Sequence, residues 1–195
     1  PMLLRQMDER EMEHWYAHEL SEAFAPNERK PLADIRCLIA EGRYELWGLF
    51  DGEKMAGYAA IWKAEGIPLV LLDYLGVSRA LRGGGLGAEI LAKLRGQGRL
   101  IVTEAELPVP GAGEEENRLR LRRIAFYRRN GFTPAYQMAT CGMRWQALLS
   151  GPRQDGRDSM EKIMKWHKEL YGPERTDVVV PLAPHEQPRP PYWMQ

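Results

Sequence analysis

The segment VSRALRGGGLGAEIL, residues 77–91, places four of the chain's 19 glycines between positions 83 and 87. Arg82 precedes these glycines, and an apolar, helix-forming stretch follows them. Glycine lets backbone N–H groups approach a ligand closely, and the free amides and positive dipole end of a helix favour phosphate. The segment therefore predicts an anion-binding site, and the identity of the anion decides the chemistry.

Three interpretations of the glycines compete with one another and with a ligand-free tight turn. In a dinucleotide site, Gly83, Gly85 and Ala88 would fit G-x-G-x-x-A, and Glu104 lies about where a ribose-binding acid would follow. Residues 78–82, however, separate the glycines from the strand end, and no N-terminal β-α-β unit precedes them. A P-loop fits less well because no Gly-Lys-Ser/Thr follows the glycines. The third interpretation takes account of the arginine.

An apolar strand end at Val77, four spacer residues and the sequence RGGGLG at 82–87 resemble the acyl-CoA loop of the GNAT superfamily of N-acetyltransferases. A second segment, RRIAFYRRNGF at 122–132, is similar to the late helix of that family, in which a tyrosine is followed after three residues by Gly-Phe. The tyrosine here is Tyr127. The resemblance covers residues 1 to about 150 and implies acetyl-CoA (coenzyme A) as cofactor.

The hydrophobic periods predict an ordered series of helices and strands. Strands are expected at 2–7, 43–50, 54–62, 68–77 and 99–107 and as a pair within 132–149, with helices at 8–24, 31–42, 88–98 and 116–131. The order β-α-α-β-β-β-α-β-α-β-β predicts an α/β (α+β) fold with a mixed, mostly antiparallel sheet flanked by helices, which is also the fold that the resemblance implies. We expect a GNAT-like domain at 1–150.

Residues 151–195 are expected to form a C-terminal extension with an amphipathic helix, a short strand and a proline-rich tail. The apolar stripe of that helix includes His167, which we expect to be packed rather than bound to a ligand.

The resemblance and the chemistry of a CoA thioester together imply a set of cofactor-binding residues. Arg82 and the loop amides would hold the diphosphate, and the strand end would pair with the amides of the pantetheine arm as an added strand does. Gly76 near that strand end predicts a bulge or a close backbone approach. The set is Leu75, Gly76, Val77, Arg82, Gly83, Gly84, Gly85, Leu86 and Gly87.

Direct attack of an amine on a thioester needs a base for the ammonium proton and an acid for the departing thiolate. Tyr127 is the predicted acid, as the corresponding tyrosine is in the resembling family. Asp73 and Glu104 are candidate bases, and Glu106 is a candidate acceptor-site residue, although ion-paired or solvated roles suit all three carboxylates equally well. We expect the acceptor between the first two helices and the loop after the fifth strand.

The composition narrows the partners. Lys plus Arg and Asp plus Glu number 27 each, so the formal net charge of this 195-residue chain is zero, and no nucleic-acid partner is expected. The sequence shows no apolar run long enough to cross a membrane and no signal-peptide core near its start, which indicates a cytoplasmic protein. Cys37 and Cys141 have no metal-type spacing, and we expect no metal.

The sequence therefore predicts an N-acetyltransferase that moves an acetyl group from acetyl-CoA to a primary amine of a small molecule or peptide. A non-catalytic acyl-CoA sensor or assembly module is the alternative, and a dinucleotide-dependent oxidoreductase is the remote one. A homodimer is left open.

Overall fold

The computed structural model describes residues 1–154 and 156–194, and the chain divides into two compact units. Unit 1 comprises Pro1–Ile67 and Leu72–Gly98, and unit 2 comprises Pro68–Leu71 and Arg99–Gln195. Their strands belong to a seven-stranded, mostly antiparallel sheet flanked by helices. This result confirms the predicted fold class.

The elements of unit 1 follow the predicted order. They are β1 (Leu3–Gln6), α1 (Glu9–His14), the π-helix η1 (Trp15–Leu20), α2 (Ser21–Ala23), η2 (Pro26–Glu28), α3 (Leu32–Ala40), β2 (Tyr44–Asp51), β3 (Lys54–Trp62), β4 (Val70–Val77), η3 (Arg79–Leu81) and α4 (Leu86–Arg95). The first two residues of β4 group with unit 2. α1, η1 and α2 run on without a break, so the single helix predicted at 8–24 is one helix with a π-helical middle.

Local signals explain where the helices of unit 1 begin. Asp8 and Glu11 form a capping box, in which each side chain accepts a hydrogen bond from the backbone amide of the other. α3 begins directly after Pro31, and proline fits the start of a helix because it has no N–H to leave unpaired.

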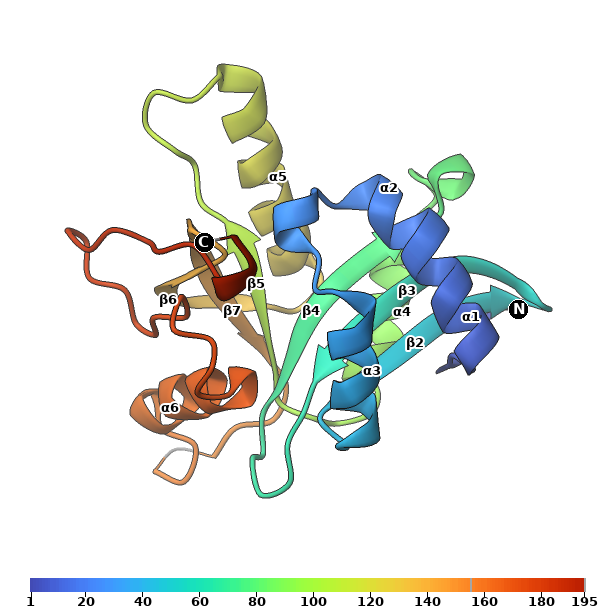
Figure 1. The fold of residues 1–195 in the computed structure, drawn as a ribbon, viewed down its shortest axis with the longest axis horizontal. Helices are drawn as coiled ribbons and strands as arrows, with labels where there is room; N and C mark the ends of the chain where they lie inside the picture. Colours follow the sequence, from blue (N-terminus) through green and yellow to red (C-terminus); the bar gives the residue numbers. More distant parts are fainter. Residues whose placement is uncertain (155, 195) are drawn as a thin grey trace. The chain divides into compact units, whose positions relative to one another are not determined.

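Unit 1 has helices on both faces of its strands. Figure 1 shows α1 and α3 in front of β2 and β3, with α4 behind them. β3 is buried from Ala56 to Trp62, as expected for a strand covered on both sides. On one face the Trp15 ring meets the Tyr58 ring edge-on at 5.7 Å. On the other, the Ile90 side chain of α4 fills the space that a side chain at Gly57 would need.

Unit 2 contains the remaining strands in the order β5-β7-β6. Its elements are β5 (Ile101–Glu106), α5 (Glu114–Arg129), β6 (Thr133–Thr140), β7 (Met143–Ser150), α6 (Met160–Tyr171) and η4 (Tyr192–Met194). Both strand pairs are antiparallel. The short strand expected near residue 179 is reduced to a single bridge between Ala139 and Val179.

The segment after Ser150 contacts the strands of unit 2. α6 buries Ile163, His167, Leu170 and Tyr171, so the packing predicted for His167 is observed. The Arg144 guanidinium of β7 donates to backbone carbonyls between residues 183 and 186, which ties the tail to the strand. The predicted boundary between a domain and an extension at residue 150 stays a prediction.

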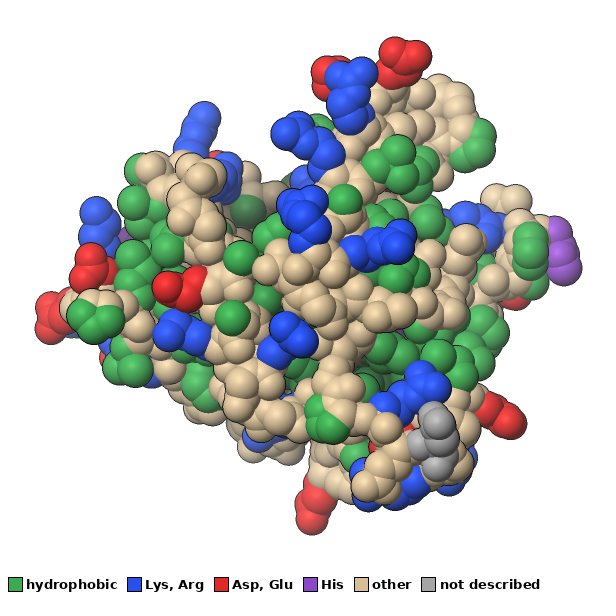
Figure 2. All heavy atoms as spheres, turned by 180° about the vertical axis from the view of Figure 1, so that it is seen from behind, with side chains coloured by type: hydrophobic (Ala, Val, Ile, Leu, Met, Phe, Trp, Pro, Cys, Tyr) green, Lys and Arg blue, Asp and Glu red, His purple; other side chains and the backbone are tan. Residues whose placement is uncertain are grey.

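No helix among the described residues is both long enough and apolar enough to cross a membrane. On the face drawn in Figure 2, Lys and Arg side chains are scattered among hydrophobic and neutral groups.

Candidate functional site

The glycine loop of unit 1 begins where β4 ends and finishes at the first residue of α4. Gly83 has a φ of +86° and Gly85, the N-cap of α4, has a φ of +80°, a region that side-chain-bearing residues rarely adopt. A Cβ atom added at either glycine would meet nothing within 4 Å. The backbone is therefore open on the side where a ligand would lie.

The amides of this loop are free to bind an anion. Among the described residues, no backbone carbonyl accepts a hydrogen bond from the amides of Gly83, Gly84 or Gly85. The first-turn amides of α4 follow directly, and the partial positive charge of a helix N-terminus adds to theirs. The loop therefore fits a diphosphate, because it offers several N–H donors and no side chain that blocks them.

Arg82 already has a partner in this structure. Its Nη2 donates to Glu22 Oε2 of α2 at 2.9 Å, and its Nε donates to the Val77 carbonyl at 3.2 Å. The Arg82 side chain is 47% exposed. A phosphate that approaches Nη2 would compete with Glu22 for this guanidinium.

The end of β4 holds the three residues predicted for the pantetheine arm, Leu75, Gly76 and Val77, all partly exposed. Gly76 is indeed a place of close approach, but the approaching group is the Tyr58 ring of β3. A Cβ at Gly76 would lie 2.2 Å from the Tyr58 hydroxyl oxygen. That hydroxyl is buried without a hydrogen-bond partner among the described residues, and burial raises its pKa.

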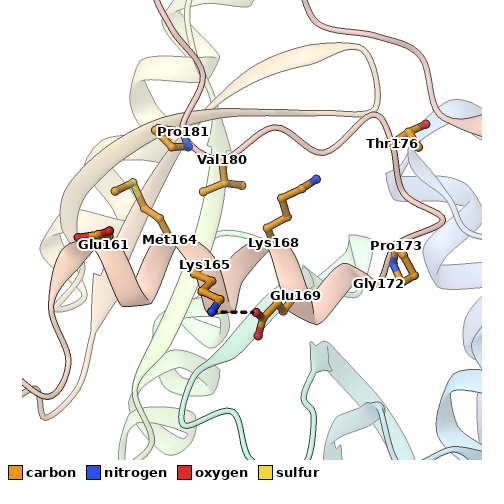
Figure 3. Close-up of a pocket in the computed structure, with 10 residues that line it drawn as sticks. All are labelled: Glu161, Met164, Lys165, Lys168, Glu169, Gly172, Pro173, Thr176, Val180 and Pro181. Atoms are coloured by element: carbon orange, nitrogen blue, oxygen red, sulfur yellow. Dashed lines mark ion pairs between the residues drawn. The ribbon is translucent and has the colours of Figure 1, made fainter.

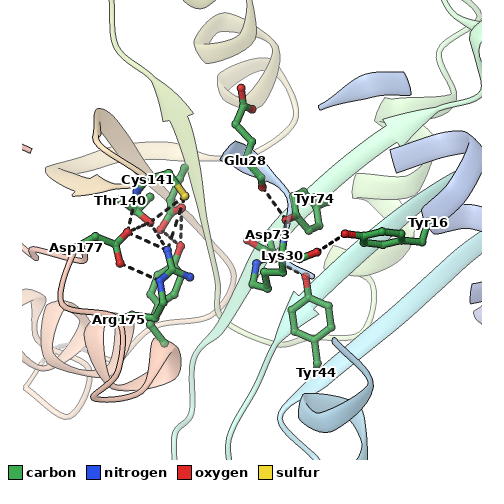
Figure 4. A network of polar contacts seen from close by, with 12 residues as sticks. Tyr16, Glu28, Lys30, Tyr44, Asp73, Tyr74, Thr140, Cys141, Arg175 and Asp177 are labelled. Atoms are coloured by element: carbon green, nitrogen blue, oxygen red, sulfur yellow. Dashed lines mark hydrogen bonds and ion pairs between the residues drawn. The ribbon is translucent and has the colours of Figure 1, made fainter. Parts of the chain in front are cut away.

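Asp73 lies earlier on β4 and belongs to a buried network of unit 1 (Figure 4). Its carboxylate accepts hydrogen bonds from Lys30 Nζ and from the Tyr44 hydroxyl. The side chains of Lys30 and Asp73 are 8% and 9% exposed. The sequence analysis missed Lys30 and Tyr44, because nothing in the sequence links a loop residue and a strand residue to a carboxylate so far along the chain.

Tyr127 lies on α5 in unit 2 and is partly buried. Its ring packs edge-on against Phe126 at 5.4 Å and against Phe132 at 5.6 Å. Burial raises the pKa of Tyr127, while a hydrogen bond with Thr103 of β5 and the charge of Arg123 act in the opposite direction. The phenol therefore stays protonated at neutral pH and can act as a donor.

Glu104 of β5 lies in a closed network of unit 2. His167 Nε2 lies 2.7 Å from Glu104 Oε2, and the Tyr171 hydroxyl donates to both carboxylate oxygens at 2.8 Å. Because a carboxylate only accepts, Nε2 carries a proton toward Glu104, and Nδ1 lies 2.7 Å from the Tyr136 hydroxyl oxygen. Burial, and then the Glu104 charge, raise the pKa of Tyr136. His167 and Tyr171, the two residues that contact Glu104, lie on α6 in the C-terminal segment, where the sequence predicted no catalytic partner.

Two further contacts in unit 2 concern the loop after β5. Glu106 Oε2 lies 3.6 Å from Arg120 Nε of α5, so this predicted acceptor-site acid is ion-paired. The Asn117 side chain both donates to and accepts from the backbone of Val109 at 2.9 Å, which fixes the loop to the first turn of α5.

The structure thus divides the predicted site residues between its units. Asp73, the strand end and the glycine loop lie in unit 1, whereas Glu104 and Tyr127 lie in unit 2. The main residues that the sequence analysis missed are Glu22, Lys30, Tyr44, Tyr58 and Tyr171.

Unit 2 also contains a second buried ion pair and a hollow. Arg175 donates to Asp177 at 2.9 Å and to Thr140 Oγ1 at 2.9 Å (Figure 4). Burial acts to raise the pKa of Asp177, but the hydrogen bond and charge of Arg175 and the hydrogen bond from the Cys141 amide hold it below its usual value. A cavity of about 660 Å³ follows α6 (Figure 3). It is lined by Glu161, Met164, Lys165, Lys168, Glu169, Gly172, Pro173, Thr176, Val180 and Pro181, none of them a predicted site residue.

A metal site is not evident. Within residues 1–154 and 156–194, no group of three or more His, Cys, Asp or Glu side chains is placed to hold a metal ion. Within the same residues, neither Cys37 nor Cys141 forms a disulfide bond.

Comparison with known proteins agrees with this geometry. Residues 42–134 match the family model of the acetyltransferase (GNAT) domain. A curated protein of Bacillus subtilis (strain 168), named "Putative acetyltransferase YjbC", is 28% identical, and the match covers 89% of this chain and 95% of that protein.

Solved structures show the same fold. A GNAT-family protein from Bacteroides thetaiotaomicron superimposes with a TM-score of 0.66 at 24% identity, covering 87% of this chain and 98% of that one. A GNAT-family acetyltransferase from Elizabethkingia anophelis, solved with acetyl-CoA bound, has a TM-score of 0.53 at 8% identity and covers 77% and 98%. The comparisons therefore support the resemblance to the GNAT superfamily that the glycine loop and the Tyr127 helix carry.

Proposed function

We propose that this protein is an N-acetyltransferase that uses acetyl-CoA and acts on a primary amine of a small molecule or peptide. The observation that carries the proposal is the open glycine loop, in which Gly83 and Gly85 adopt positive φ and present free amides at the N-terminus of α4. The match of residues 42–134 to the acetyltransferase (GNAT) domain model and an acetyl-CoA-bound structure of the same fold support it.

Each predicted residue has a part in this proposal. The amides of residues 83–87 and the Arg82 guanidinium would hold the diphosphate, and Leu75, Gly76 and Val77 would pair with the pantetheine arm. When bound, acetyl-CoA supplies a thioester that an amine can attack. Tyr127, which stays protonated, donates a hydrogen bond to the sulfur as negative charge develops there.

The base is assigned to Asp73 before Glu104. Glu104 accepts hydrogen bonds from two side chains of α6, whereas Asp73 is held by a loop lysine and by the hydroxyl of Tyr44. A non-catalytic acyl-CoA-binding protein is the second candidate, because both carboxylates already have side-chain partners in this structure.

Gly85→Val tests the role of the loop. A branched side chain at Gly85 would stand in the open space before the amides, so we expect CoA affinity to fall by at least about 100-fold, equivalent to the loss of two or more charge-assisted hydrogen bonds. Gly66→Val is the matched control, because Gly66 has a φ of +79° and equally open surroundings in the same unit. Titration calorimetry with CoA should show full affinity in the control. Equal affinity in both folded variants would remove the loop from the cofactor site.

A further inference from the structure

Lys30 is the one buried lysine among the residues that the structure describes. Its side chain is 8% exposed, whereas the other six lysines are exposed or partly exposed. Lys30 Nζ donates to the Asp73 carboxylate and lies near three aromatic rings. The distances from Nζ to the ring centroids are 4.8 Å for Tyr74, 5.1 Å for Trp62 and 5.6 Å for Tyr44.

The backbone of Lys30 is fixed as well as its side chain. Its amide donates to the Tyr74 hydroxyl at 3.0 Å, and its carbonyl accepts from the Tyr16 hydroxyl at 2.7 Å (Figure 4). The Tyr44 hydroxyl donates to Asp73, so the carboxylate is oriented toward the ammonium group. These contacts hold one cation at one place.

A carboxylate beside several aromatic faces is an arrangement that binds alkylammonium ions. A contribution to folding stability explains the Lys30–Asp73 pair poorly, because a buried ion pair generally stabilises a protein no more than apolar residues of the same volume would. The position is also informative: Asp73 precedes Leu75 by two residues, about 7 Å along the same face of β4. Lys30 itself lies in the connection between the first two predicted helices, and the sequence analysis expects these helices to form one side of the acceptor site.

We propose that Asp73 and the rings of Tyr44, Trp62 and Tyr74 form an ammonium-binding site, which Lys30 fills in the free protein. The ligand class is an unbranched primary alkylammonium, of which the lysine side chain is itself an example. In the working enzyme, the ammonium group of the acceptor displaces Lys30. This last statement rests on the proposed acetyl transfer, but the existence of the ammonium site does not.

A tethered lysine competes at a high effective concentration, so free amines should bind the wild-type protein weakly. Lys30→Ala removes the competitor and leaves the rings and the carboxylate in place. We expect the Tm of this variant to fall by roughly 10 °C, because a buried charge loses its partner. n-Butylammonium chloride should then restore most of the Tm in a saturable way, whereas n-butanol or NaCl at equal ionic strength should not.

Two control variants define the specificity. Lys168→Ala removes an exposed lysine whose Nζ donates to the Val178 carbonyl at 2.6 Å, and its Tm should not respond to the amine. Lys30→Ala combined with Asp73→Asn should lose the response, because the carboxylate is gone. Equal responses in all variants, or no response in Lys30→Ala at 100 mM amine, would overturn the proposal.

Refolding keeps the test decisive if Lys30→Ala does not fold in buffer. Urea-denatured protein is diluted into n-butylammonium, n-butanol or NaCl, and folding is followed by circular dichroism. Recovery with n-butylammonium alone supports the site, and the same outcome in all three solutions overturns it. Adding CoA in parallel separates this proposal from the proposed function: a Tm shift with CoA and none with the amine would overturn only the ammonium site.

Discussion

Asp73 and Glu104 are two strand carboxylates that look alike by burial and differ in what holds them. Each side chain is 9% exposed, and each accepts hydrogen bonds from two side chains. Asp73, on β4 of unit 1, is held by Lys30 from a loop and by Tyr44. Glu104, on β5 of unit 2, is held by two residues of the packed helix α6.

The difference shows why burial alone does not identify a base. Freeing Glu104 would require α6 to move, with the loss of the apolar surface that Ile163 and Leu170 bury. Breaking the ion pair of Asp73 requires one lysine side chain to leave its position, while the hydrogen bond from Tyr44 can stay. An exchangeable partner suits a group that must receive a proton from a substrate, whereas a partner fixed by a helix suits a structural role.

The largest effect is expected from Tyr127→Phe, which tests whether unit 2 contributes a catalytic residue. The change keeps the ring contacts with Phe126 and Phe132 and removes only the donor. Acetyl transfer should slow by about 100-fold or more, with CoA affinity nearly unchanged, because the donor acts mainly as the thiolate leaves. Turnover and CoA binding are measured separately on a confirmed acceptor.

Tyr136→Phe is the matched control for that change. It removes a hydroxyl that contacts His167 in the same unit and should cost stability without slowing turnover. If Tyr127→Phe turns over as fast as the wild type, Tyr127 is a packing residue and the proton donor lies elsewhere.

Glu104→Gln sharpens the comparison of the two carboxylates. The substitution weakens the charge-assisted contacts with His167 and Tyr171, so unfolding should become easier by about 2 kcal/mol, or a Tm roughly 5 °C lower. CoA affinity should not change. Glu115→Gln, at an 80% exposed side chain paired with Arg118, should leave the Tm within about 1 °C. A normal Tm combined with lost turnover would instead make Glu104 the base.

The smallest effect concerns Glu22, whose carboxylate accepts a hydrogen bond from Arg82 Nη2 in this structure. Glu22→Gln should release the guanidinium and remove a nearby negative charge, tightening CoA binding by roughly two- to fivefold. Arg82→Gln in the same background should abolish that gain. Weaker CoA binding in Glu22→Gln would show that Glu22 contributes to the loop in some other way.

The sequence was sufficient to predict the fold and the position of the glycine loop before α4, because both depend on local signals. Apolar periods, Pro31 at the start of α3 and glycines before α4 act within a few residues of where they stand. His167 was likewise predicted to be packed from its place on an apolar stripe, and it is buried.

The partners of the carboxylates could not be predicted, because they depend on tertiary structure. Lys30 and Asp73 are 43 positions apart, and Glu104 and His167 are 63 apart. Gly76 shows an intermediate case: its small size predicts a close approach, but only the structure shows that the approaching group is the Tyr58 ring.

Thermal unfolding with CoA, acetyl-CoA, NAD and ATP tests the central claim most directly, since it needs no acceptor. At about 100 times the dissociation constant, a ligand that binds only the folded protein stabilises it by roughly 2.7 kcal/mol, a Tm rise of about 5–10 °C for a chain of this size. We predict that rise with CoA and acetyl-CoA and a much smaller one with NAD or ATP. A rise with NAD and none with CoA would contradict the account and return the glycine loop to the dinucleotide interpretation.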